Sequence, residues 1–278
     1  MTSLPLEPAM PQAMPQAMGF LTDTTLCIGC KACEVACKQW NQLPMDNFGW
    51  TGNSYDNTGD LGSATWRHVA FVERLGDGEG KRPTTLHAFQ SNWLMLSDVC
   101  KHCANAGCME ACPTGAIVRT EFDTVVIQQD ICNGCGYCVP ACPFGVPDLS
   151  PTDHKAHKCT LCYDRLGDGL EPACAKACPT DSIQFGTVDD LMARARGRVA
   201  GLQERGVEGA YVYGDHEVGG TGGIDGLNAF FILTAPPEVY NLPAQPELPQ
   251  RKVLPAALST LGAALALGAA ALFSLRSR

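Results

Sequence analysis

The pattern of hydrophobic and polar residues divides the 278-residue chain into regions of different character. The longest hydrophobic stretch runs from Val253 to Leu275 and contains no charged residue. Its length suits one crossing of a hydrocarbon layer of about 30 Å. A buried helix of a soluble protein is the alternative, but such long uncharged runs are uncommon there. We therefore predict a transmembrane helix over 253–275.

Alternating hydrophobic and polar residues predict strands elsewhere in the chain. Trp66 to Glu73 alternates, Gly76 to Gly80 indicates a turn, and Leu86 to Leu96 is the expected return strand. Two short strands are expected at 116–118 and 182–185.

The region after residue 186 combines one helix with a hairpin. Val188 to Arg205 has the composition of a surface helix, with Thr187 as N-cap and acidic residues in the first turn. Tyr211 to Thr234 indicates two strands around a glycine-rich loop, GGTGG, which matches no complete phosphate-binding signature. A proline-rich linker then leads to the hydrophobic C-terminal segment.

Cysteine usage changes the picture, because the 16 cysteines form four quartets with none left over. The first and third quartets follow C-x2-C-x2-C-x3-C, the spacing of bacterial ferredoxin [4Fe–4S] sites. The quartets are Cys27, Cys30, Cys33, Cys37; Cys100, Cys103, Cys108, Cys112; Cys132, Cys135, Cys138, Cys142; and Cys159, Cys162, Cys174, Cys178.

The spacing has a physical reason. A tight loop can bring three thiolates to three corners of a cubane cluster, and small residues such as Gly29, Ala32, Gly134 and Gly136 let the backbone approach closely. In two-cluster ferredoxins the fourth cysteine ligates the other cluster. We therefore expect [4Fe–4S] clusters and single-electron transfer.

Two other uses of cysteine are weaker interpretations. A disulfide framework is typical of short secreted chains, and C-x2-C pairs make poor disulfides. Structural zinc uses C-x2-C pairs but has no use for the longer ferredoxin spacing. Zinc at the second or fourth quartet, whose spacings are looser, stays open.

Charge and the N-terminal segment limit the classes of partner. The formal net charge of −9 argues against nucleic acid and favours a protein partner. Met1 to Gly19 is rich in Pro, Ala and Met, and lacks a basic start, a long apolar run and a twin-arginine motif. We therefore expect an arm there rather than a secretory signal.

Three segments together resemble the iron–sulfur subunit of membrane-bound formate dehydrogenases, within the wider set of subunits that serve molybdopterin oxidoreductases. They are LCIGCKACEVACKQWN (26–41), CNGCGYCVPACPFGVP (132–147) and the region 158–186 with KCTLCYDR and EPACAKACPTDSIQFG. The glycine-rich hairpin and the terminal helix extend the resemblance over most of residues 22–275.

The resemblance implies an α+β fold of two ferredoxin-like [4Fe–4S] modules with an inserted β segment and a single C-terminal transmembrane helix. The expected parts are an N-terminal arm (1–21), a four-cluster domain (22–190, insertion 38–99), a C-terminal lobe and linker (191–250) and the helix (253–275).

The family's ligand pairing joins the first quartet to the fourth and the second to the third. The implied sets are Cys27, Cys30, Cys33, Cys178; Cys159, Cys162, Cys174, Cys37; Cys100, Cys103, Cys108, Cys142; and Cys132, Cys135, Cys138, Cys112. The first two would lie nearer a catalytic subunit and the last two nearer the membrane.

The resemblance also implies the partners. Electrons would come from a molybdenum or tungsten bis-pterin site in a catalytic subunit and pass to a membrane cytochrome b subunit and to quinone. The chain itself would carry no formate chemistry. Its helix would cross the inner membrane with the cluster domain in the periplasm, although flanking charges alone do not orient it: Arg251 and Lys252 precede the span, and Arg276 and Arg278 follow it.

Two other functions stay open. One is electron transfer for another molybdopterin enzyme, such as a polysulfide, tetrathionate or dimethyl sulfoxide reductase. The other is a free ferredoxin-like carrier, which the predicted membrane span disfavours.

Polar residues beside the cysteines could modulate such clusters through charge and hydrogen bonds. His102 is not needed as a ligand, so we expect it to hydrogen-bond beside a cluster. A buried lysine would favour the arrival of an electron, but lysines are mostly exposed. We therefore expect the four lysines beside or between the quartets to lie at the surface: Lys31, Lys101, Lys158 and Lys176.

Overall fold

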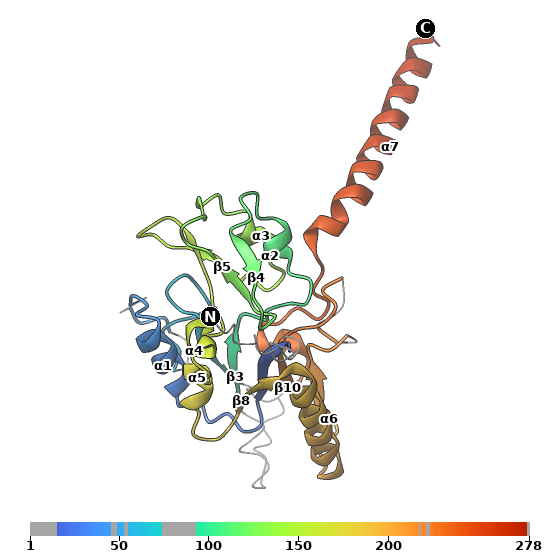
Figure 1. Cartoon of the computed structure of the whole chain (residues 1–278). Coiled ribbons are helices and arrows are strands. Elements are labelled where there is room, and N and C mark those ends of the chain that lie inside the picture. Colours follow the sequence, from blue (N-terminus) through green and yellow to red (C-terminus); the bar gives the residue numbers. More distant parts are fainter. Residues whose placement is uncertain are drawn as a thin grey trace, which may run out of the picture.

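The computed structural model describes residues 16–45, 49–52, 55–73, 93–216, 218–220 and 223–276. These residues form a mixed α/β body with one long helix projecting from it (Figure 1). The body contains a four-stranded sheet of order β8-β1-β10-β9 and three two-stranded ribbons. The sheet strands are β8 (Ile183–Thr187), β1 (Met18–Asp23), β10 (Ala229–Leu233) and β9 (Tyr211–Tyr213).

Strand β1 lies in the middle of this sheet, antiparallel to β8 and parallel to β10. It begins at Met18, within the range 1–21 that the sequence assigns to the N-terminal arm. Neighbouring side chains of a strand point to opposite faces. Phe20 therefore packs with Cys33, Cys159 and other cysteines, whereas Leu21 packs on the opposite face. One face of the sheet thus supports the cysteine-rich region.

Helix α6 (Val188–Glu204) covers the opposite face and confirms the predicted surface helix. Thr187 is its N-cap, and the Thr187 hydroxyl accepts a hydrogen bond from Asp190 N at 3.3 Å. Leu191 and Ala195 are fully buried against Leu21 of the sheet. The predicted hairpin after this helix is also confirmed, because β9 pairs with β10 in antiparallel register.

The ribbons match the strand predictions with shifted boundaries. β2 (Arg67–Glu73) pairs antiparallel with β3 (Trp93–Val99), which ends three residues beyond the predicted Leu96. The predicted turn at Gly76 to Gly80 lies outside the described residues. The strands expected at 116–118 and 182–185 are confirmed as β4 and β8. The other two ribbons pair β4 (Ile117–Arg119) with β5 (Val125–Ile127) and β6 (Asp148–Leu149) with β7 (Ala156–His157).

Short helices carry or follow the cysteines, and they gather in two groups. α1 contacts α5, and α4 lies beside them, at one end of the body; α2 contacts α3 and β4 at the other end (Figure 1). A 3-10 helix, η2 (Pro237–Tyr240), follows β10. The short α-helices are α1 (Ala32–Trp40), α2 (Gly107–Glu110), α3 (Cys138–Ala141), α4 (Tyr163–Gly167) and α5 (Ala173–Lys176).

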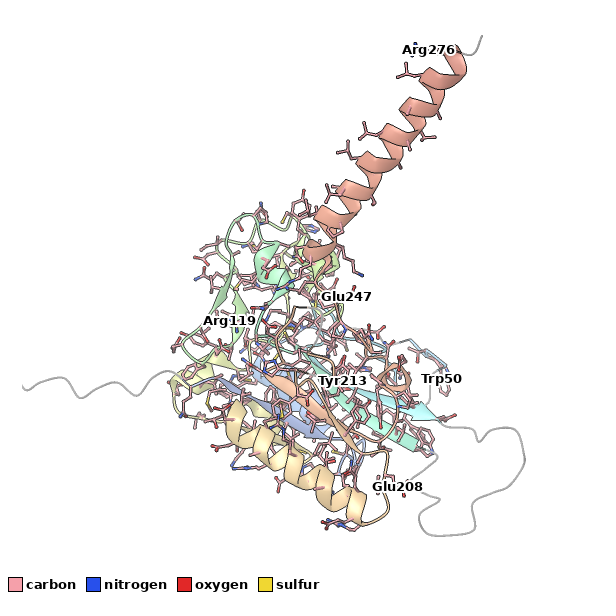
Figure 2. All side chains as sticks on the ribbon, turned by 90° about the vertical axis from the view of Figure 1, so that its right-hand side faces the viewer. Trp50, Arg119, Glu208, Tyr213, Glu247 and Arg276 are labelled. Carbon is pink, nitrogen blue, oxygen red and sulfur yellow. The ribbon has the colours of Figure 1, made fainter. Side chains whose placement is uncertain are left out.

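Helix α7 (Pro249–Arg276) contains the predicted hydrophobic span and begins four residues earlier than residue 253. Figure 2 shows Glu247 near its base and Arg276 at its far tip, well clear of the body. Its segment Pro249–Leu272 has a mean hydropathy of 1.8, and none of its most apolar window is buried. By length and composition this helix could cross a membrane.

The central strand supplies a test of the packing. A Cβ atom at Gly19 would lie 1.9 Å from the carbonyl oxygen of Asn228, whereas one at Gly197 in α6 would meet no atom within 4 Å. We expect Gly19→Ala to lower the free energy of unfolding by about 1–3 kcal/mol because backbone must move. Gly197→Ala should raise it by roughly 1 kcal/mol, because alanine favours a helix interior.

The thermal unfolding midpoint of the purified protein measures both effects. The midpoint should fall for Gly19→Ala and stay level or rise for Gly197→Ala. Equal midpoints for Gly19→Ala and the unsubstituted protein would contradict the close packing of β1 against residue 228.

Candidate metal centres

The structure brings cysteines from different quartets into common cavities. One cavity is lined by thiols of the first quartet together with Cys178 of the fourth. Val69, Ser97 and Ile183 line the same cavity from the hairpin and the sheet. The cysteines on its wall are Cys27, Cys30, Cys33 and Cys178.

A second cavity repeats this arrangement with the other two quartets. Its walls include Lys101, His102, Phe144 and Lys158 beside the thiols. The cysteines on its wall are Cys100, Cys103, Cys108 and Cys142.

The remaining eight cysteines form two further neighbourhoods, because cysteines of the same neighbourhood raise one another's pKa values. Burial raises the pKa of Cys159, and negative charge on Cys37, Cys100, Cys162 and Cys174 contributes in the same direction. Cys100 belongs to the second cavity, which leaves Cys37 with the three thiols of the fourth quartet. Burial likewise raises the pKa of Cys138 to about 11, with contributions from Cys132, Cys135 and Cys112. Each neighbourhood thus combines three thiols of one quartet with one from another.

These neighbourhoods follow one another through the body. Cys174 contributes to the raised pKa of Cys33, Cys100 to that of Cys159, and Cys138 to that of Cys108. The order therefore begins with the Cys27 cavity and continues through the Cys159 group and the Cys100 cavity to the Cys138 group. Figure 1 shows α1 and α5 at one end of the body and α2 and α3 at the other.

The loops around the cysteines use left-handed backbone, and at Gly134 the chain comes as close to a neighbouring segment as the small residues predicted. Gly29 has a φ of +66° and Gly134 a φ of +73°. A Cβ atom at Gly134 would lie 2.1 Å from the carbonyl oxygen of His154. Glycine is therefore required there both for conformation and for space.

The donor set fits a polynuclear iron–sulfur group. All 16 cysteines are free thiols, which removes the disulfide interpretation. Burial raises the pKa of Cys33 to about 11 and that of Cys108 to about 12, so these thiols need bound cations to become thiolates. In the part of the chain that the structure describes, no three His, Cys, Asp or Glu side chains converge as a single metal ion requires. The thiols instead surround cavities.

Two of the four lysines contradict the expectation of surface positions. Lys101 and Lys158 are 1% and 3% exposed, whereas the Lys176 side chain is 73% exposed and Lys31 lies between these extremes. Lys158 donates to the carbonyls of Val125 and Cys159. Burial alone would lower its pKa, but the charges of neighbouring thiolates, first Cys100, raise it. Thiolates at these cysteines would thus stabilise a buried cation that sequence composition disfavours.

His102 hydrogen-bonds beside the Cys100 cavity, as expected for a residue that is not a ligand. Its Nδ1 accepts the backbone N–H of Val125 at 3.1 Å. Burial, followed by the positive charges of Lys158 and Arg119, lowers the pKa of His102 well below its usual value. The ring is therefore neutral at pH 7.

Sequence motifs missed two polar residues that touch the thiols. Arg67 of β2 donates to Cys174 Sγ at 3.3 Å, and Ser97 of β3 lies 3.2 Å from Cys33 Sγ. Neither residue belongs to a cysteine motif. The one available signal was a charged residue at the start of a predicted strand, which is not specific.

Family comparisons agree with the cysteine chemistry. Residues 91–188 match a family described as a 4Fe-4S dicluster domain, and residues 24–41 match a 4Fe-4S binding domain.

Curated relatives extend the match over most of the chain. The iron–sulfur subunit of the nitrate-inducible formate dehydrogenase of Escherichia coli is 41% identical over 232 residues, covering 82% of this chain and 73% of that subunit. The formate dehydrogenase iron–sulfur subunit of Haemophilus influenzae is 40% identical, covering 82% and 69%. One component polypeptide of the anaerobic dimethyl sulfoxide reductase of Escherichia coli is 33% identical, covering 62% and 75%.

The ferredoxin-type cysteine motifs, the interleaved thiols and an identity of about 40% over most of the chain agree with one another. The chain belongs to the family of iron–sulfur, electron-transfer subunits of formate dehydrogenase.

Proposed function

We propose that this chain holds four [4Fe–4S] clusters and transfers electrons from a molybdopterin catalytic subunit to a membrane cytochrome b subunit. The observation that carries the proposal is the interleaving of the quartets, in which two cavities each contain four thiols from two distant segments. Clusters of this type, when bound, supply one-electron redox chemistry.

The ligand sets follow the four neighbourhoods of thiols. The Cys27 cavity and the Cys159 group form the first pair, and the Cys100 cavity and the Cys138 group form the second pair. The proposed ligands are Cys27, Cys30, Cys33, Cys178 and Cys37, Cys159, Cys162, Cys174 for the first pair, and Cys100, Cys103, Cys108, Cys142 and Cys112, Cys132, Cys135, Cys138 for the second.

The second pair lies nearer the membrane in this proposal. Gln250 at the start of α7 donates to the carbonyl of Gly107 in α2 at 2.8 Å, and α3 also contacts α7. The base of the apolar helix is therefore joined to the segments that carry the second and third quartets. The first pair, at the opposite end, is the expected side for the catalytic subunit.

The overall reaction balances across the complex. Oxidation of formate to carbon dioxide releases two electrons and one proton at the catalytic subunit. Two electrons pass singly along this chain, and a quinone takes them up with two protons. The protein residues of this chain hold and insulate the redox groups and take no part in the formate chemistry.

The same proposal includes domain boundaries and location. Residues 22–190, extended at their start by β1, form the two-module cluster domain, with 38–99 inserted and 191–250 as the lobe and linker. Helix α7 spans the inner membrane once, and the cluster domain faces the periplasm. None of its most apolar window is buried, which supports the membrane position.

A second candidate is electron transfer for a different molybdopterin enzyme. The 33% identity to a component of a dimethyl sulfoxide reductase supports this second candidate. The higher identity and coverage for formate dehydrogenase subunits favour formate as the electron source. A free carrier is disfavoured, because an exposed apolar helix like α7 would not remain in water.

Formate itself tests the proposed electron source. Low-temperature EPR of the detergent-solubilised complex should show several interacting [4Fe–4S] signals after formate is added, because the catalytic subunit would reduce the clusters. Dithionite serves as the control reductant. Signals that appear with dithionite but not with formate would reject the formate assignment and favour the second candidate.

Matched cysteine variants test the ligand sets. Cys30 and Cys135 are both exposed and hold equivalent places in the first and third quartets. We expect Cys30→Ser and Cys135→Ser each to lose or convert one cluster, and to slow formate-to-quinone transfer, because a thiolate ligand is missing. The EPR signals lost should differ between the two variants. Unchanged iron content and rate in either variant would refute its ligand assignment.

The location of the cluster domain can be tested by proteolysis. Protease added to intact spheroplasts of the native host should digest the cluster domain and leave α7 in the membrane. A cytoplasmic marker protein should stay intact in the same sample. Full protection of the cluster domain, with digestion only after the membrane is permeabilised, would place it in the cytoplasm.

A further inference from the structure

The buried guanidinium of Arg67 lies between two groups of thiols. Arg67 is 1% exposed, and its Nη2 donates to Cys174 Sγ at 3.3 Å. Its Nη1 donates to the carbonyl of Ser97 at 3.1 Å and to the Ser97 hydroxyl at 3.4 Å. Cys174 belongs to the Cys159 group, so Arg67 contacts that group directly.

Ser97 extends this contact to the Cys27 cavity. Its hydroxyl lies 3.2 Å from Cys33 Sγ. Because Ser97 Oγ accepts from Arg67, its proton is available for donation to Cys33. The hairpin β2–β3 therefore places a continuous polar connection between the two thiol groups, from Cys174 through Arg67 and Ser97 to Cys33.

The charge of Arg67 has no carboxylate counter-ion among the described residues. Its Nε has no hydrogen-bond partner there, and the guanidinium lies 4.7 Å from the centre of the Phe20 ring. Arginine stays protonated even when buried. A buried cation of this kind requires nearby negative charge, and the thiols of Cys33, Cys174 and Cys159 are the groups able to supply it.

From this geometry we propose that Arg67 raises the reduction potentials of both clusters of the first pair, with Ser97 transmitting part of the effect to the cluster held by Cys33. The proposal rests on the ligand sets given under Proposed function. A cluster held by four thiolates is anionic and gains one more negative charge when it accepts an electron. A fixed buried cation therefore stabilises the reduced form more than the oxidised form. Arg67 keeps its proton throughout.

The test is a potentiometric EPR titration of the purified complex with two variants. Arg67→Gln removes the charge and keeps an amide donor, whereas Arg67→Lys keeps the charge. In Arg67→Gln, the equilibrium constant for one-electron reduction should fall at least tenfold for both first-pair clusters, a potential lowered by about 59 mV or more. Arg67→Lys should lower it by a smaller factor.

The protein supplies its own controls. The cluster of the Cys138 group should keep its potential in both variants, because this group lies at the far end of the row from Arg67. The cluster of the Cys100 cavity should change less than the first-pair clusters, because Arg67 contacts none of its ligands although the charge of Arg67 acts on His102 beside it. Arg196→Gln, which removes an exposed arginine of α6, should leave all potentials unchanged. Unchanged first-pair potentials in Arg67→Gln, with all clusters present, would overturn the proposal.

Ser97→Ala decides the question if the Arg67 variants fail to assemble. This substitution removes only the hydroxyl. It should lower the reduction potential of the cluster held by Cys33, which is the cluster whose EPR signal Cys30→Ser abolishes. Unchanged potentials would overturn the proposal. Measurements on the unsubstituted complex distinguish a failure of this proposal from a failure of the proposed function. If four cluster signals appear in it and Arg67 has no effect, only the role of Arg67 fails; if they do not appear, the ligand sets fail.

Discussion

The convergence of thiols from distant segments is the constraint on which the rest of the structure depends. The Cys27 cavity joins residues 27–33 to Cys178, which follows Cys33 by 145 positions in the sequence. The Cys100 cavity is closed in the same way by Cys142. Burial raises the pKa values of Cys108 and Cys142, and bound metal would convert such thiols to thiolates and thereby stabilise the fold.

The protein around the thiols meets two physical demands, close packing and control of charge. Strand β1 turns Phe20 toward the cysteines and Leu21 toward α6, so that one sheet serves two cores. Lys158 and Arg67 are buried cations near the thiols, in positions that would be costly in an ordinary apolar core, whereas the buried Lys101 pairs with the carboxylate of Asp98. Their placement is intelligible if the thiol groups carry net negative charge, as they would with clusters bound.

The arrangement of the parts is consistent with the proposed path of electrons through this chain. The four thiol groups follow one another through the body. The α2–α3 end, opposite α1 and α5 in Figure 1, is joined to the base of α7. The chain belongs to the family of formate dehydrogenase iron–sulfur subunits, and a row of thiol groups suits the electron transfer that this family performs. The dimethyl sulfoxide reductase relative shows that related proteins serve a different enzyme, so electron source and electron path are separate properties.

Much of this protein was determined by local sequence. Cysteine spacing indicated the iron–sulfur chemistry, the uncharged run from Val253 predicted α7, and the Thr187 cap with its acidic first turn predicted α6, because each depends on residues close together in the chain. The central position of β1, the burial of Lys101 and Lys158, and the contacts of Arg67 with Cys174 and Ser97 were decided only by tertiary structure. They arise from segments more than 25 residues apart, as in the hydrogen bond from Arg67 to Cys174 at a separation of 107 positions. Sequence periodicity and composition indicate whether a residue prefers water or the protein interior. They do not indicate which charged groups from distant segments will lie beside that residue in the fold.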